Sequence, residues 1–109
     1  MHVIVKLRGV IIGHAELAVR DTATGLTRGP FRPGLGWELV EPVFLLREEA
    51  SAVPDALARY ERARAALQFE LTTGDGRPLP IDQLDIRLER RGAKAVATEL
   101  VVRSDGPLA

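Results

Sequence analysis

The first twenty residues alternate between apolar and polar side chains in a way that predicts a β-hairpin. Apolar residues stand at positions 3, 5 and 7, and the pair Arg8-Gly9 that follows is typical of a tight turn. The next segment, 10–20, alternates again, with a mainly apolar face and a face that carries His14 and Glu16. Gly13 interrupts this second strand, so we expect a bulge or a close approach of another segment there.

The middle of the chain is rich in residues that interrupt regular structure. Residues 21–25 (DTATG) have the composition of a turn, and residues 28–36 (RGPFRPGLG) hold three glycines and two prolines, which predicts a structured loop. The following segment, WELVEPVFLLR, returns to β character, but Pro42 cannot donate to a ladder of hydrogen bonds. We therefore expect two short strands there, at 37–41 and 43–47.

One segment, from about Pro54 to Leu67, predicts a helix. It consists almost wholly of strong helix formers, and a proline is tolerated in the first turn. Leu57, Tyr60, residue 63 or 64, and Leu67 recur at steps of three and four residues. They form one stripe, which we expect to be buried against a sheet.

Three further strands are expected after this helix. Residues 69–73 alternate before the turn Gly74-Asp75-Gly76, and residues 84–88 alternate strictly. A last alternating run, 96–102, follows a turn around Gly92. The second and third of these strands should therefore form a hairpin.

Together these elements predict the fold class. Strands, one helix and further strands are typical of an α+β domain, here with a mainly antiparallel β-sheet and one helix packed on one face. The chain has 109 residues, of which 46% are hydrophobic, the size and balance of one globular domain. We expect a single domain over residues 1–103 and a short flexible tail at 104–109.

Charge and composition narrow the possible partners. Lys and Arg together number 15, as do Asp and Glu, so the formal net charge is +0 and no long-range field favours nucleic acid or a membrane surface. The chain contains no cysteine, which excludes disulfides and thiolate chemistry. The N-terminal segment lacks the pattern of a signal peptide. We accordingly expect a cytoplasmic protein, and the excess of Arg over Lys fits a bacterium with a GC-rich genome.

The sequence contains no catalytic motif. Its two serines, Ser51 and Ser104, do not stand in a nucleophile elbow, and the glycines of 28–36 match no phosphate-binding loop. We expect no catalytic residue and no cofactor, and favour a protein that is not an enzyme. The basic residues Arg87, Arg90, Arg91 and Lys94 predict a solvated turn.

An excess of apolar residues in the hairpin favours a protein-interaction module. Polar residues at alternate positions mark the exposed face of the hairpin. Ile4, Val10 and Ile12 fall on that same face and would form an apolar patch typical of an interface. Phe31, in the expected loop, is a further candidate contact. The first hypothesis is a small subunit, or an accessory or immunity-type protein of a bacterial complex, that binds a protein partner or forms a homodimer.

The alternative hypothesis is a small-ligand-binding or enzymatic domain with a pocket between the sheet and the 28–36 loop. His14 and Glu16 lie two residues apart on one strand, so their side chains emerge on the same face, and Arg32 could add a cation. Together with His2 they match no metal-binding spacing, so we expect no metal site. Convergence of His14, Glu16 and Arg32 on one concavity would favour this alternative.

Overall fold

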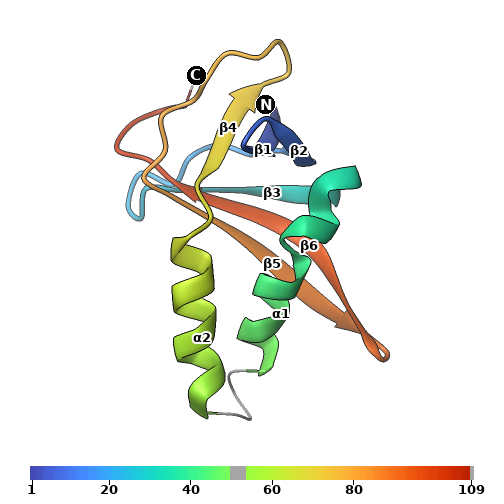
Figure 1. Cartoon of the computed structure of the whole chain (residues 1–109). Coiled ribbons are helices and arrows are strands. Elements are labelled where there is room, and N and C mark those ends of the chain that lie inside the picture. Colours follow the sequence, from blue (N-terminus) through green and yellow to red (C-terminus); the bar gives the residue numbers. More distant parts are fainter. Residues whose placement is uncertain (50–53, 109) are drawn as a thin grey trace.

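The computed structural model describes residues 1–49 and 54–108 and shows an α+β domain built around one antiparallel sheet (Figure 1). In chain order the elements are β1 (His2–Leu7), β2 (Val10–Glu16), β3 (Leu26–Pro33), the 3-10 helix η1 (Leu35–Leu39), α1 (Glu41–Glu49), α2 (Pro54–Ala65), β4 (Phe69–Thr73), β5 (Gln83–Arg91) and β6 (Lys94–Arg103). The predicted fold class is confirmed, but the described residues form two α-helices where one was expected.

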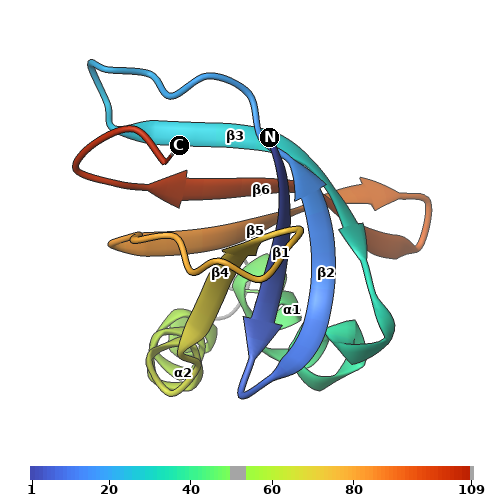
Figure 2. The same ribbon diagram turned by 90° about the horizontal axis from the view of Figure 1, so that it is seen from above.

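The sheet is bent, and β3 is the strand at which it bends. The strand order is β4-β1-β2-β3-β6-β5, with neighbouring strands antiparallel. Residues 26–30 of β3 pair with β6, whereas residues 31–33 pair with β2. Figure 2 shows the consequence, because β1 and β2 run across the direction of β5 and β6. β4 and β5 are left as the two edge strands.

The loop predicted at 28–36 is wrong for residues 28–33, which belong to β3. Pro30 is tolerated because it lies where β3 changes partner, so its missing N–H falls at the end of a ladder. Gly29 is required by a close approach, since a Cβ on this residue would lie 1.8 Å from the carbonyl oxygen of Glu16. The residues that suggested a loop therefore allow a strand to bend.

The two short strands predicted at 37–41 and 43–47 are also wrong, because η1 and α1 occupy this region. Pro42 stands in the first turn of α1, where its missing N–H removes no helical hydrogen bond. The indole N–H of Trp37 donates to the Glu41 carboxylate at 2.9 Å and links the two helices. α1 then directs Phe44 into the core, where it is fully buried.

One hydrophobic core joins the strands, η1 and the helices. Aromatic rings form a row through it: the ring centroids of Phe31 and Trp37 lie 5.7 Å apart, those of Trp37 and Phe44 5.6 Å, and those of Phe44 and Phe69 6.2 Å. This row connects β3, η1, α1 and β4. None of the helices in the described ranges is both long and apolar enough to span a membrane.

A β-bulge in the opening hairpin changes which residues face the core. Val5 pairs with Gly13 and Lys6 with Ile11, so Ile12 is the extra residue of β2. Ile12 is fully buried as a result, while Ile11 is 41% exposed. The bulge predicted near Gly13 is confirmed, but the parity that placed Ile12 on an exposed face is wrong.

The stripe predicted on α2 is only partly correct. Tyr60 and Leu67 pack against the core, but Leu57 is 48% exposed and its neighbour Ala56 is fully buried. The physical reason is the position of the helix, since the first turn of α2 lies beside α1, away from the sheet (Figure 1).

The segment after β6 begins with a buried residue. Ser104 donates its main-chain N–H to the carbonyl oxygen of Gly25 at 3.0 Å. Its own carbonyl oxygen accepts from Arg20 at 2.8 Å. The segment predicted as a tail is therefore bound at its first residue to the turn before β3.

Candidate functional site

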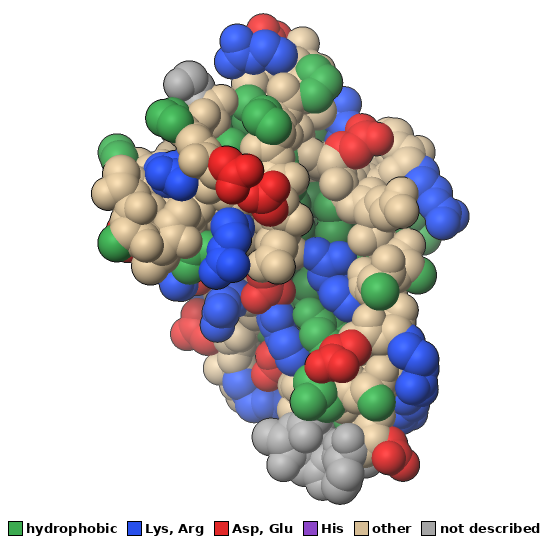
Figure 3. Space-filling view, turned by 90° about the vertical axis from the view of Figure 1, so that its left-hand side faces the viewer, with side chains coloured by type: hydrophobic (Ala, Val, Ile, Leu, Met, Phe, Trp, Pro, Cys, Tyr) green, Lys and Arg blue, Asp and Glu red, His purple; other side chains and the backbone are tan. Residues whose placement is uncertain are grey.

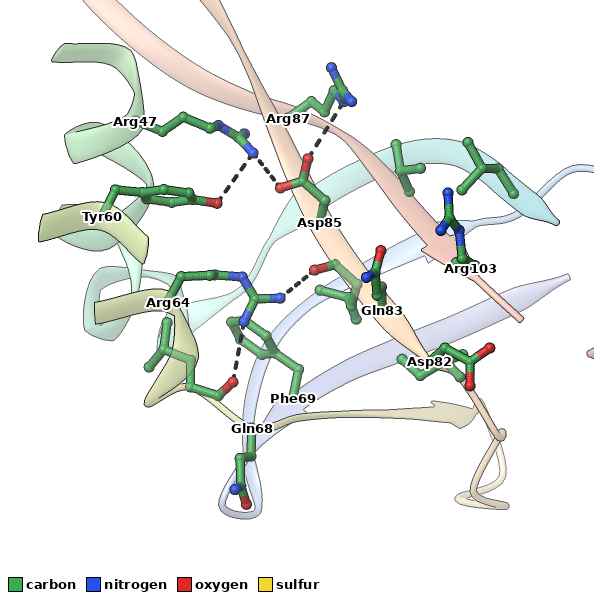
Figure 4. Close-up of a pocket in the computed structure, with 15 residues that line it drawn as sticks. Arg47, Tyr60, Arg64, Gln68, Phe69, Asp82, Gln83, Asp85, Arg87 and Arg103 are labelled. Carbon is green, nitrogen blue, oxygen red and sulfur yellow. Dashed lines mark hydrogen bonds and ion pairs between the residues drawn. The ribbon is translucent and has the colours of Figure 1, made fainter. Parts of the chain in front are cut away.

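A cleft of about 650 Å3 opens between α2, the start of β4 and β5. In Figure 3 basic side chains gather around a hollow in which hydrophobic side chains are visible, and Figure 4 shows the residues that line it. The charged lining residues are four arginines and two aspartates, namely Arg47, Arg64, Arg87, Arg103, Asp82 and Asp85. The uncharged ones are mainly apolar, among them Leu67, Phe69 and Leu84. We call this the arginine cleft.

The arginine cleft occupies the seam between the two edge strands. β4 contributes Phe69 and β5 contributes residues 83–85 and Arg87, although these strands stand at opposite ends of the strand order. The sheet therefore curls until its two edges face each other across the cleft. An edge strand presents main-chain groups without a partner strand. Other donors are needed to satisfy its carbonyl oxygens.

Arg47 of α1 supplies such donors to β5. Its guanidinium donates to the carbonyl oxygen of Ile86 at 2.8 Å and to the carboxylate of Asp85 at 2.5 Å. Burial, the largest influence, would lower the pKa of Arg47, but the hydrogen bond and the charge of Asp85 outweigh it and the pKa is raised. Arg47 therefore remains protonated and is a fixed link between α1 and β5.

Arg64 of α2 makes a second link. It donates to the carbonyl oxygen of Leu84 on β5 and, at 3.2 Å, to that of Leu67. Its guanidinium carbon lies 4.9 Å from the ring centroid of Phe69, within the range of a cation–π contact. One side chain thus connects α2, β4 and β5 across the seam (Figure 4).

Arg87 and Arg103 leave more of their donors open to the cleft. The Nε atom of Arg87 lies 3.6 Å from a carboxylate oxygen of Asp85, in a pair that is partly exposed. Arg103 is exposed and makes no ion pair with any residue in the described ranges. Gln83 is its register partner on β5, so these two side chains share a face of the sheet. The cleft therefore combines available positive charge with apolar surface.

The three residues of the ligand hypothesis come together in a second, smaller hollow. His14, Glu16 and Arg32 line a cavity of about 430 Å3 on the outer face of β1, β2 and β3, together with His2. His14 and Arg32 are register partners, which explains why their side chains are neighbours. Because residues 28–33 form a strand, this hollow lies on the sheet itself and not beside a loop. We call it the histidine hollow.

The four residues of the interaction hypothesis do not share one surface. Ile12 and Phe31 are buried in the core, Ile4 is partly buried, and Val10 is 42% exposed at the tip of the hairpin. The bulge explains the burial of Ile12. Phe31 is buried because it lies in a strand whose neighbouring side chains point outward. The prediction that these residues form one exposed patch is therefore wrong. Of the four, Val10 is the one that is exposed.

The sequence pattern did not reveal the arginine cleft, although α2 carried one signal. Arg64 falls on the same stripe as Tyr60 and Leu67, and an arginine among apolar positions often has an internal partner. The basic cluster that includes Arg87 predicts only a solvated turn. Arg103 gives no signal, because the cleft exists only after the sheet has curled.

Neither metal-ligating clusters nor comparisons with other proteins add to the geometry of the site. Within residues 1–49 and 54–108, no group of three or more His, Cys, Asp or Glu side chains is arranged to hold a metal ion. Comparison of the chain with protein-family models, with curated proteins and with solved structures gives no match. The fold and site define an α+β domain whose bent six-stranded sheet carries an arginine-lined cleft at its seam.

Proposed function

We propose that this domain binds an anionic small molecule in the arginine cleft, through a carboxylate or phosphate group next to an apolar part. The observation that supports this proposal is the presence of four arginines and two aspartates beside exposed apolar surface in one cleft of about 650 Å3. A pocket with apolar walls and a few polar groups is typical of ligand-binding sites.

The individual arginines have different roles in the proposed site. Arg47 and Arg64 are held by carbonyl oxygens of β5, so they give the site a rigid, positively charged wall. Arg103 has donors available for a ligand, and a guanidinium can bind two oxygens of a carboxylate or phosphate at once. Phe69 and Leu67 offer apolar contact to the rest of the molecule.

The experiment is a calorimetric titration with phenyl phosphate, inorganic phosphate and phenol. Phenyl phosphate should bind more tightly than either component, because it alone uses both parts of the cleft. Arg103→Gln should weaken its binding about 10- to 100-fold, the loss expected for a hydrogen bond to a charged group. Arg90→Gln is the matched control, since it removes the same charge from an exposed position of β5 outside the cleft. Equal affinity in wild type and Arg103→Gln would contradict the proposal.

A second candidate function, self-association, is favoured by a separate observation. Val10 and Ile11 are 42% and 41% exposed, and η1 lies against them, since a Cβ on Gly36 would meet the carbonyl oxygen of Ile11. Leu35 and Leu39 of η1 are exposed as well. We propose a second copy of the chain as the occupant, because twofold dimers are the commonest assemblies.

Sedimentation equilibrium tests this second candidate. The wild-type chain should dimerise in a concentration-dependent manner, and Leu35→Lys should lower the fraction of dimer while the monomer remains folded. Val19→Lys, at another exposed apolar position, is the control. A monomer at all concentrations would exclude self-association and leave the anion-binding proposal unaffected.

A further inference from the structure

The histidine hollow contains a series of polar side chains that crosses three strands. Glu16 on β2 is the register partner of His2 on β1, and His14 lies two residues before Glu16 on the same face of β2. Arg32 on β3 is in turn the register partner of His14. From neighbour to neighbour the series is therefore the Glu16 carboxylate on β2, the His2 imidazole on β1, the His14 imidazole on β2 and the Arg32 guanidinium on β3.

Hydrogen bonds connect the first three of these groups. Nδ1 of His2 lies 3.0 Å from Oε1 of Glu16, and because a carboxylate can only accept, Nδ1 carries the proton. Nε2 of His2 lies 3.4 Å from Nδ1 of His14, within hydrogen-bond distance. The two rings are stacked with centroids 5.4 Å apart. Nε2 of His14 is left to interact with a molecule in the hollow.

We propose that the histidine hollow binds a small oxyanion, a phosphate or carboxylate group, between the guanidinium of Arg32 and a protonated His14. Within the described ranges Arg32 makes no ion pair, so its donors are available. Pro30 and Pro33 line the hollow and have no N–H groups to offer an anion.

Glu16 has a positioning role in this proposal. His14 gains one proton from the solvent at Nε2 when the anion binds, and the carboxylate stabilises that positive charge through His2. Two other charged groups are near. The amino group of Met1 lies 3.7 Å from Glu16, and Asp75, in the turn that brings Gly74 beside the His2 ring, accepts from the Thr73 hydroxyl.

The first test follows the imidazole signals by nuclear magnetic resonance during titration with inorganic phosphate. The chain has two histidines, so each ring can be assigned with one variant. Both signals should move and saturate, and Arg32→Gln should weaken binding about 10- to 100-fold. Arg90→Gln, with the same change of charge elsewhere on the surface, should bind phosphate like the wild type. The proposal would be overturned if the ring signals did not shift on addition of phosphate, or if Arg32→Gln bound phosphate with the same affinity as the wild type.

Glu16→Gln distinguishes binding that depends on the hydrogen-bonded series from binding by Coulomb attraction alone. Removing a negative charge near a bound anion should strengthen binding if only Coulomb attraction matters. The proposed series predicts weaker binding, because the imidazole pair loses the carboxylate that favours its protonated form. Unchanged or stronger binding would overturn it. The ring signals report on the histidine hollow, so this result is independent of the arginine cleft.

Discussion

Arg64 of α2 donates a guanidinium N–H to the main-chain carbonyl oxygen of Leu84 at the edge of β5. Arg47 makes the same kind of contact with Ile86, two residues further along the strand. Carbonyl groups two residues apart point to the same side of a strand. The two arginines therefore occupy the position of a neighbouring strand, and the helices close the seam of the sheet with side-chain donors.

Replacement of Arg64 by Leu should destabilise the fold. The apolar bulk of the side chain is largely kept, but the carbonyl oxygen of Leu84 loses its donor in a partly buried position. We expect a loss of about 1 to 3 kcal/mol in the free energy of unfolding, measured by urea denaturation. Arg62→Leu, exposed on the same helix, should change it by less than about 0.5 kcal/mol. Equal stability of the two variants would show that the contact with Leu84 is dispensable.

Gly29→Ala should destabilise the bend in β3. The new Cβ would lie 1.8 Å from the carbonyl oxygen of Glu16, a main-chain atom that cannot move without shifting β2. We expect a loss of about 1 to 3 kcal/mol or more, measured by thermal unfolding. Gly106→Ala is the control, because a Cβ there has no neighbour within 4 Å. A melting temperature unchanged by Gly29→Ala would contradict this account of the bend.

The Asp75 carboxyl group should titrate below its ordinary range. A hydrogen bond from the Thr73 hydroxyl, followed by one from its own main-chain N–H, lowers the pKa of Asp75. A lowered pKa in the folded state stabilises the fold above the ordinary pKa, and this contribution is lost as the pH falls through the lowered value. Thr73→Val should therefore raise the pKa of Asp75, measured by carboxyl-carbon resonance. Thr98→Val should leave it unchanged, and a shift of equal size in both variants would refute the assignment.

The sequence predicted the elements whose signal is local. Alternation identified the opening hairpin and the strands around 84–88 and 96–102, because a half-buried strand repeats every two residues wherever it lies. The predictions for residues 28–33 and 37–47 were wrong because proline and glycine interrupt regular structure at some positions and are tolerated within it at others. Pro30 falls at a change of partner strand and Pro42 in a first helical turn, and neither position can be read from neighbouring residues.

The buried face of α2 differs from the predicted stripe, and this difference can be tested. Leu57 is exposed and Ala56 is buried, so Leu57→Ala should change the free energy of unfolding by less than about 0.5 kcal/mol. Ala56→Leu places a larger side chain in a filled space and should cost about 1 to 3 kcal/mol. Urea denaturation measures the free energy of unfolding of both variants. If Leu57→Ala were the more destabilised of the two, Leu57 would be buried as the sequence predicted.

The two candidate sites differ in how far the sequence could predict them. His14 and Glu16 share a face because of their spacing on one strand, which is a local property. The proximity of Arg32 depends on the register between β2 and β3, and that of Arg64 to β5 depends on the curl of the whole sheet. Long-range pairing of this kind has no local signal in one sequence.

The bulge in β2 leads to a last prediction, which separates two neighbouring isoleucines. Ile12 is fully buried and Ile11 is 41% exposed, although strict alternation would assign them the opposite roles. Ile12→Ala should lower the free energy of unfolding by about 2 to 5 kcal/mol, because it leaves a cavity in the core. Ile11→Ala should cost far less, and Ile12→Lys should unfold the domain, since it buries an unpaired charge. Circular dichroism during urea denaturation measures all three. A folded, stable Ile12→Lys variant would mean that this position faces solvent, as the parity of the hairpin first suggested.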